Sequence, residues 1–308
     1  MTSIESKLLG CTPYSSFLSE QNAAKLFLRS GWESTHGLYY DDPLTNKQRE
    51  LDVVARQIWK RKSQSGEQLG RITLLLEVKS MKGFHLLISE HPAESDDFFE
   101  HIHWLGDPTG KYVEVNQGLI NLGRKPEEIG RLLKALHQHA YPRQTCRMWK
   151  MMVRPHPIAT FTSFRETNLG SEKDLDNSVF WRASQNLRSA HASISGNIRE
   201  VHLETLLGAA EFEAKNKDWM RSMLWWASQQ IGMVDIIHPI VVTDAEIWVA
   251  SGDRPSQRGF ARFGTHTYTG RMDWWCDVVN SEYLEEYVDQ LTQHYRKHMR
   301  SAKAQLRD

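Results

Sequence analysis

The sequence lacks the cysteine pattern of a disulfide-built or zinc-binding protein. Its three cysteines, Cys11, Cys146 and Cys276, are isolated from one another in a chain of 308 residues, and none has C-x-x-C spacing. This favours a reducing compartment. There is also no run of about 18 apolar residues, and no positively charged apolar segment opens the chain. We therefore expect a soluble, cytoplasmic protein with no membrane partner.

An excess of charge of one sign is also missing. The formal net charge is zero, so the whole molecule carries no field that attracts nucleic acid, and any polyanion site must be local. The sequence contains no glycine-rich phosphate loop, nucleotide-binding fingerprint, Ser-His-Asp arrangement or internal repeat. Apolar residues make up 40% of the chain, which permits a real core in one large domain or two small ones.

What the sequence does contain is a strong hairpin signal. Two apolar runs, residues 49–59 and 71–80, are joined by the polar stretch 60–70. This pattern predicts a β-hairpin with a loose loop.

Three charged residues interrupt these otherwise apolar strands. Asp52 lies near the start of the first strand, and Glu77 and Lys79 lie at the end of the second. Because Glu77 and Lys79 are two residues apart, their side chains leave the same face of the strand. The three residues fall where the two strands can lie side by side, so we take this point as the candidate site.

The remaining patterns complete an α/β protein. Helical spacing predicts helices over 15–30, 126–140, 176–195, 206–231 and 281–306. Strands or extended segments are expected at 37–40, at 82–89 beside the hairpin, at 145–157 and at 273–280. A pair of strands joined by a tight turn at Asp244-Ala245 is expected at 240–243 and 246–250, and a mobile loop at 254–264.

We expect these elements to form a central mixed sheet flanked by helices. The chain 1–308 is predicted as a single domain, with core segments 15–89 and 172–308. The stretch 90–171 is predicted as a helical insertion or elaboration of that core.

The acidic residues of the hairpin suit a divalent cation. Asp52 and Glu77 offer hard oxygen ligands of the kind that Mg²⁺ prefers. Glu20, on the predicted helix 15–30, is placed to complete the metal shell through water. Carboxylates packed together raise each other's pKa, so they need a cation to stay ionised. Lys79 would position the attacking water or stabilise the charge that develops on a phosphate.

The order of these residues resembles the PD-(D/E)XK nuclease superfamily, which has the restriction-endonuclease-like fold. The matching residues are Glu20 in SEQNAAKLFLRSGW, Asp52 in RELDVVA, and Glu77 and Lys79 in LLLEVKS. The resemblance covers residues 15–89 and extends loosely to 176–195 and 236–250. Two departures are Leu51, which replaces the superfamily's proline before Asp52, and the interruption of the core by 90–171.

The resemblance implies an activity and a set of partners. It implies a Mg²⁺-dependent hydrolase of phosphodiester bonds, with Mn²⁺ as a substitute, and it maps a helix glutamine of the superfamily onto Gln185. DNA is the favoured substrate, and RNA is left open. A role in restriction or anti-phage defence is implied, as a subunit of a multi-protein system. A homodimer is also expected, because cutting two strands is easiest with two sites. The best local phosphate contacts are Arg56, Lys60, Arg61 and Lys62.

Other interpretations of the same residues stay open. The fold could serve a catalytically inactive subunit that binds nucleic acid or a partner protein. The hairpin charges could simply be solvated, or the carboxylates could serve a small-molecule hydrolase.

Several further candidates favour a structural role. The pairs His101/His103 and His137/His139 have no cysteine partners at zinc spacing. Asp244 has the position of a turn residue. The tryptophan pairs 225–226 and 274–275 fit core packing better than base stacking.

Overall fold

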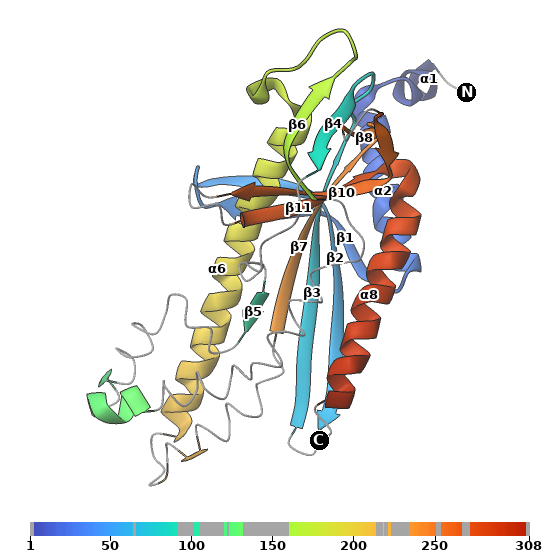
Figure 1. Ribbon diagram of the computed structural model, residues 1–308. Coiled ribbons are helices and arrows are strands. Elements are labelled where there is room, and N and C mark those ends of the chain that lie inside the picture. The colour runs from blue at the N-terminus through green and yellow to red at the C-terminus, as the bar shows by residue number, and fades with distance from the viewer. Residues whose placement is uncertain are drawn as a thin grey trace.

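The protein is mixed α/β, with a large sheet covered by helices on both faces (Figure 1). The computed structural model describes residues 3–63, 66–90, 102–104, 120–121, 123–131, 160–213, 218, 221–222, 234–250, 254–266 and 272–305. Within these ranges, no helix is both long enough and apolar enough to cross a membrane.

Eleven strands of the described chain form one sheet. The path through it runs β1 (Glu33–Asp42), β2 (Lys47–Ser63), β3 (Gly66–Lys79), β7 (Val234–Thr243), β11 (Met272–Asn280), β10 (Phe260–His266), β6 (Thr160–Thr167), β4 (His85–Glu90), β8 (Ile247–Val249) and β9 (Ser256–Arg258), while β5 (Ile102–Trp104) pairs with β7. The strands β1, β2 and β3 form an antiparallel meander, and β7 is parallel to β3. The expected mixed sheet is thereby confirmed.

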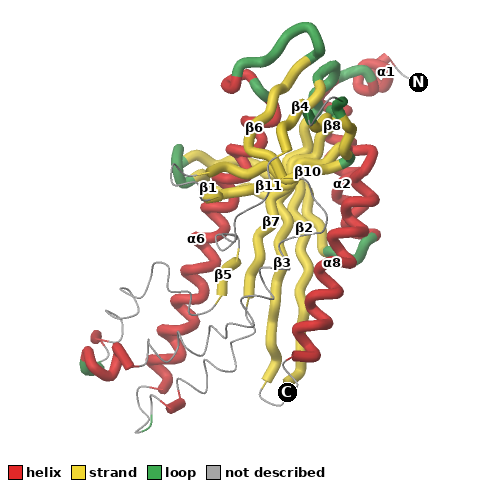
Figure 2. Tube along the Cα trace, viewed as in Figure 1, coloured by secondary structure: helices red, strands yellow, loops and turns green. Residues whose placement is uncertain are grey.

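Helices cover both faces of the central strands. On one face lie α2 (Thr12–Arg29) and α8 (Leu284–Gln305), and on the other lies α6 (Val179–Glu213) (Figures 1 and 2). Because β3 is covered on both faces, successive residues Leu74, Leu75 and Leu76 are all fully buried. A strand in this position is apolar continuously rather than at alternate positions.

The two predicted outer helices are confirmed. The prediction 15–30 corresponds to α2, which buries Ala23, Ala24 and Phe27. The prediction 281–306 corresponds to a short 3-10 turn, η3 (Ser281–Tyr283), followed by α8. The 3.6-residue apolar stripe of α8 is buried against the sheet at Leu284, Tyr287, Val288, Leu291 and Tyr295.

The helix α6 is longer than predicted. It spans Val179–Glu213 without a break, whereas the sequence indicated two helices, 176–195 and 206–231. Gly196 lies inside it, at a cost of only about 1 kcal/mol relative to alanine, which does not end a helix of this length. The predicted helical positions beyond 213, apart from 218 and 221–222, lie outside the described residues.

A buried carboxylate fixes the start of α6. Glu166 on β6 accepts hydrogen bonds from Ser178 Oγ at 2.9 Å and from the backbone N–H of Val179 at 2.8 Å, and it pairs with Lys173. Ser178 in turn caps the first turn by accepting from Trp181 N at 3.0 Å. A negative charge at a helix N-terminus satisfies the free N–H groups and interacts favourably with the helix dipole.

Several predicted strand pairings were wrong. The stretch 60–70 was expected as a loop, but it continues the hairpin ladder up to the pair Ser63 and Gly66. The ladder is held by backbone hydrogen bonds, which polar side chains also allow. The strand β4 pairs with β6 and β8 instead of lying beside the hairpin. The strands β7 and β8 do not pair with each other, and 254–264 contains β9 and part of β10 instead of a loop.

The stretch 90–171 is described only in part. It contributes β5, which pairs with β7, and β6, which pairs with β4 and β10, so two of its segments belong to the sheet. Residues 126–131 are helical, in agreement with the start of the predicted helix 126–140. The remainder of that helix and the extended segment 145–157 lie outside the described residues.

Candidate functional site

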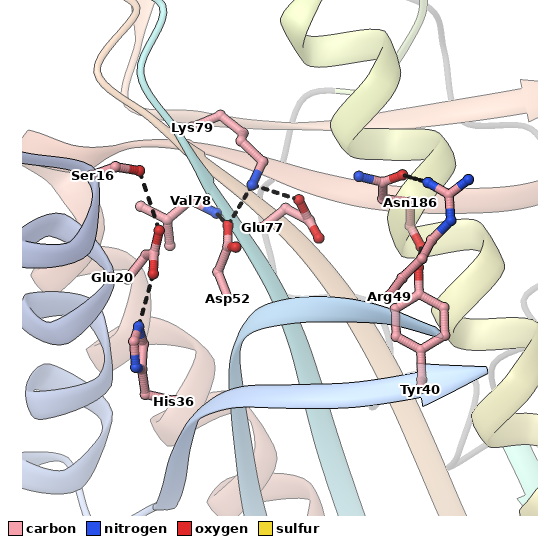
Figure 3. Close-up of polar contacts among 10 residues, drawn as sticks. All are labelled: Ser16, Glu20, His36, Tyr40, Arg49, Asp52, Glu77, Val78, Lys79 and Asn186. Atoms are coloured by element: carbon pink, nitrogen blue, oxygen red, sulfur yellow. Dashed lines mark hydrogen bonds and ion pairs between the residues drawn. The ribbon is translucent and has the colours of Figure 1, made fainter. Parts of the chain in front are cut away.

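The hairpin brings the three predicted charged residues together. In the antiparallel ladder of β2 and β3, Val53 pairs with Leu76. Asp52 and Glu77 are the next residues on the two strands, and residues directly opposite in an antiparallel pair project from the same face. Lys79 follows Glu77 by two positions, and its side chain lies between the two carboxylates (Figure 3).

The Lys79 ammonium contacts both carboxylates. Its Nζ lies 2.7 Å from Asp52 Oδ2 and 2.8 Å from Glu77 Oε2. Asp52 Oδ2 also accepts a hydrogen bond of 2.7 Å from the backbone N–H of Val78. Since both oxygens touch the same nitrogen, they are separated by no more than two hydrogen-bond lengths.

A bend in β1 accompanies the position of Asp52. The register pairs His36 with Val53 and Leu38 with Leu51, which leaves Gly37 opposite Asp52. Gly37 has φ +70°, and a Cβ there would lie 2.8 Å from Glu50 Oε1. Only glycine adopts this backbone without strain, so the sequence supplies the bend beside Asp52.

Burial controls the charge of Glu77. Its side chain is 1% exposed. Burial raises the pKa of Glu77 to about 7; the Lys79 ammonium opposes this rise, and the Asp52 charge adds to it. Among the described residues, neither Glu77 oxygen receives a well-aligned hydrogen bond. A buried carboxylate with unused lone pairs at the end of an apolar strand is costly unless a cation is nearby.

Lys79 stays positively charged between these acids. Burial by itself lowers the pKa of the Lys79 ammonium, but the Glu77 and Asp52 carboxylates outweigh this and hold the pKa above its usual value. The group is therefore a fixed cation at neutral pH.

The donor set fits a hard cation. Glu77 offers two buried oxygens, of which Oε2 contacts the Lys79 ammonium, and Asp52 lies on the other side of the same ammonium. Carboxylate oxygens arranged in this way are the ligands that Mg²⁺ uses. Within the described part of the chain, no group of three His, Cys, Asp or Glu side chains converges, so protein ligands beyond this pair would have to be replaced by water or substrate.

Glu20 has different partners from those predicted. Its Oε2 lies 2.8 Å from His36 Nε2, and its Oε1 accepts from Ser16 Oγ at 3.2 Å. The His36 and Phe17 rings pack edge to face, with centroids 4.9 Å apart. Glu20 lies on the α2 side of Asp52 in Figure 3 but makes no direct contact with it. Its proposed role through a water molecule stays a prediction.

On α6, the residue that contacts the site is Asn186. The sequence had instead indicated Gln185, the residue before it. The Asn186 amide lies beside Glu77 and lowers the pKa of that carboxyl, against the larger effect of burial. Gln185 carries a buried Nε2 that has no hydrogen-bond partner in the described chain. The helical period could have found Asn186, because it lies three residues after buried Ala183 and four before buried Ala190.

The sequence analysis also missed Arg49, Asp42 and Tyr40. Arg49 Nη1 donates to Asn186 Oδ1 at 3.1 Å, and its Nε lies 2.6 Å from Asp42 Oδ2. The Tyr40 hydroxyl donates to the backbone carbonyl of Asn186 at 3.1 Å. These contacts fix α6 against the β1–β2 hairpin next to Glu77.

The predicted phosphate contacts are spread along β2. Arg56 is exposed, four residues from Asp52. Lys60, Arg61 and Lys62 are about 26 Å or more from Asp52 at the usual rise of a strand, and their side chains lie outside the described residues. They would therefore meet a different part of any bound polymer, and their role stays a prediction.

Other candidates have structural positions. Asp244 lies in the link between β7 and β8, where it accepts from Met81 N at 2.6 Å and from Ser80 Oγ at 2.6 Å. Trp274 and Trp275 are buried in the core. The side chains of the pairs His101/His103, His137/His139 and Trp225/Trp226 lie outside the described residues.

Comparison with known proteins adds no relative. No protein-family model, curated protein or solved structure matches this chain.

Proposed function

We propose that this protein is a metal-dependent nuclease that hydrolyses phosphodiester bonds of nucleic acid, with DNA as the favoured substrate. The observation that carries the proposal is the convergence of Asp52, Glu77 and Lys79 at one point of the β2–β3 hairpin. Burying two acids and an ammonium at the end of a strand costs folding free energy. Groups of this kind are typical of functional sites, and these three are suited to chemistry on a phosphate.

The order of elements supports the proposal. A helix bearing Glu20 precedes the hairpin, Asp52 is on β2, and Glu77 and Lys79 are on β3. The helix α6 follows, and β7 then pairs in parallel with β3. The order of Glu20, Asp52, Glu77 and Lys79 is the one on which the resemblance to the PD-(D/E)XK superfamily rests.

In this proposal Asp52 and Glu77 hold Mg²⁺, with Mn²⁺ as a substitute. The bound ion would lower the pKa of a water ligand and neutralise charge on the phosphate in an in-line attack. Burial favours the ion for a physical reason, because a cation restores the ionised form of Glu77, whose pKa burial raises to about 7.

Lys79 would serve the reaction from beside the acids. With a metal present, the carboxylates share their charge with the ion, and the ammonium is freed to turn toward a phosphate oxygen or the attacking water. A charged donor that is already positioned stabilises the developing negative charge strongly. The zero net charge of the chain fits a nuclease whose affinity for nucleic acid comes from such local groups.

The test is cleavage of plasmid, linear duplex and single-stranded DNA, and of RNA, with Mg²⁺ or Mn²⁺. We expect Glu77→Gln and Lys79→Ala each to lower the rate by about a hundredfold or more. The matched controls are Glu172→Gln and Lys82→Ala, which change exposed residues and should leave the rate unaltered. Activity that persists in both site variants would belong to a contaminant or another site and would defeat the proposal.

The inactive-subunit alternative predicts a different result. It requires that purified protein bind no Mg²⁺ or Mn²⁺ by calorimetry and cleave none of the four substrates. The inward orientation of both Asp52 and Lys79 supports the active form. The proposal also includes a place in restriction or anti-phage defence, which a phage-challenge experiment tests. It includes assembly as a homodimer or with a partner, which size-exclusion chromatography tests.

A further inference from the structure

Arg49 is held in place by acceptors on two sides. Its Nε lies 2.6 Å from Asp42 Oδ2, and its Nη1 donates to Asn186 Oδ1 at 3.1 Å. One contact comes from the end of β1 and the other from α6. A guanidinium fixed at two of its nitrogens has already lost most of its rotational freedom.

The anchoring carboxylate does not depend on Arg49 alone. Asp42 is buried and accepts from the Ser189 hydroxyl, from Thr45 Oγ1 at 2.8 Å and from Leu44 N at 3.0 Å. The Ser189 hydrogen bond is the largest of the effects that hold the pKa of Asp42 well below its usual range. The acid is therefore a permanent negative support for the guanidinium.

Asn186 connects this arginine to the candidate site. Its amide oxygen faces Arg49, and its amide nitrogen points toward Glu77 (Figure 3). The Asn186 amide therefore lies between Arg49 and Glu77. Arg49, Asn186, Glu77 and Lys79 follow one another across the site.

Part of the guanidinium remains available. The side chain of Arg49 is 40% exposed. The two contacts given above are made through Nε and Nη1. A positioned, partly exposed guanidinium is suited to a phosphate oxygen.

We propose that Arg49 binds a phosphodiester group of the nucleic-acid backbone beside the one that is cleaved. This inference rests on the proposed function and deepens it by assigning a substrate contact on the α6 side of Glu77. Arg49 would set the position of the strand over the acids, with Asp42 and Asn186 as its positioning residues. Lys79 and Arg49 would then engage the backbone from the two sides of Glu77.

The test is equilibrium binding without metal. Fluorescein-labelled single-stranded and duplex oligonucleotides are titrated with the protein in EDTA, and anisotropy is read across about 50 to 200 mM salt. We expect Arg49→Gln to weaken binding by about fivefold to tenfold and to reduce the salt slope by about one. Arg49→Lys should keep the slope and still bind more weakly, because it keeps the charge and loses the planar fork. Arg165→Gln, at an exposed ion pair on β6, should match the unmodified protein.

A second arm separates backbone phosphate from free phosphate. Inorganic phosphate at millimolar concentration should displace the oligonucleotide only weakly. If inorganic phosphate alone binds in an Arg49-dependent way and the oligonucleotide does not, the site takes a free anion and the inference is overturned.

The outcomes separate this inference from the nuclease proposal. Unchanged affinity and salt slope in both Arg49 variants overturn it, even if the protein cleaves DNA. So does the absence of measurable binding by the unmodified protein to any oligonucleotide. Arg49-dependent binding without any cleavage supports the contact and counts against the nuclease. Thermal unfolding monitors the fold, and Arg49→Lys decides the matter if Arg49→Gln unfolds.

Discussion

At the scale of single residues, the site is controlled by how burial and charge compete. Glu77 is enclosed at the end of an apolar strand, and one ammonium faces both it and Asp52. The sequence predicted these three residues because charges stand out in an apolar strand. It did not predict Arg49 or Asp42, because no local pattern marks their contacts. It also missed Asn186, although the helical period places that residue between buried Ala183 and Ala190.

The raised pKa of Glu77 predicts a pH dependence of stability. Burial raises its pKa from 4.5 to about 7, so the folded state holds a proton that the unfolded state releases. The associated stability is full below pH 4.5 and is lost as the pH rises through 7. Glu77→Gln cannot ionise. As the pH rises from 5 to 8, its free energy of unfolding should therefore increase relative to that of the unmodified protein, by up to about 3 kcal/mol.

This is measured by urea unfolding in EDTA at several pH values. Glu172→Gln, at an exposed position, should show no such trend. A stability difference between Glu77→Gln and the unmodified protein that stays constant over this range would show that Glu77 does not titrate there.

At the scale of elements, individual helices and strands follow local patterns, whereas their pairing does not. The alternation and apolar runs located β2, β3, β7 and β11. The strand β7 pairs with β3 and not with β8, which follows it in the chain. This pairing depends on α6, which crosses over the sheet before β7, and it joins segments that are far apart in the sequence. The turn at Asp244 looked like a hairpin turn, yet its carboxylate binds Met81 N and Ser80 Oγ at the end of β3.

The start of α6 offers a test at this scale. Glu166→Ala removes a buried acceptor from Ser178 Oγ and Val179 N, and it leaves Lys173 without its partner. We expect the free energy of unfolding to fall by about 3 kcal/mol, because hydrogen bonds to a charged group are among the stronger ones. Glu166→Gln should lose less, since it keeps an oxygen acceptor.

Urea unfolding followed by circular dichroism measures both losses. Glu172→Ala, six residues along the chain and exposed, is the control and should change stability by less than about 0.5 kcal/mol. Equal stability of Glu166→Ala and the control would mean that α6 begins without help from this carboxylate.

At the scale of the whole molecule, a buried polar network joins the sheet to α8. Asp277 on β11 accepts from Arg262 Nε at 2.6 Å and from Tyr287 Oη at 2.7 Å, and its Oδ2 lies 2.7 Å from His238 Nε2. Tyr295 Oη lies 2.7 Å from His238 Nδ1. Burial lowers the pKa of His238, so the neutral ring donates to Asp277 and accepts from Tyr295.

Breaking this network should destabilise the whole fold. Burial by itself raises the pKa of Asp277, but Arg262 and His238 hold it well below its usual value. Its stability contribution is therefore present above the ordinary aspartate pKa and lost as the pH falls. Asp277→Asn leaves the Arg262 charge buried without its partner, and we expect a loss of about 3 to 5 kcal/mol at pH 7.

The measurement is thermal and urea unfolding at pH 7, with Asp289→Asn on the exposed side of α8 as the control. A loss below about 1 kcal/mol would show that the network is replaceable. The loss caused by Asp277→Asn should shrink as the pH falls toward the native pKa of Asp277.

The sequence alone determined the outer helices α2 and α8, the strands β2, β3, β7 and β11, and the three central charges of the site. Periodicity, capping residues and a charge inside an apolar strand are local properties. The tertiary structure alone decided the strand order, the continuity of α6, and the joining of Asp42, Arg49 and Asn186 to Glu77. Those outcomes depend on which surfaces bury one another across long separations in the chain, and no short window of sequence carries that free energy.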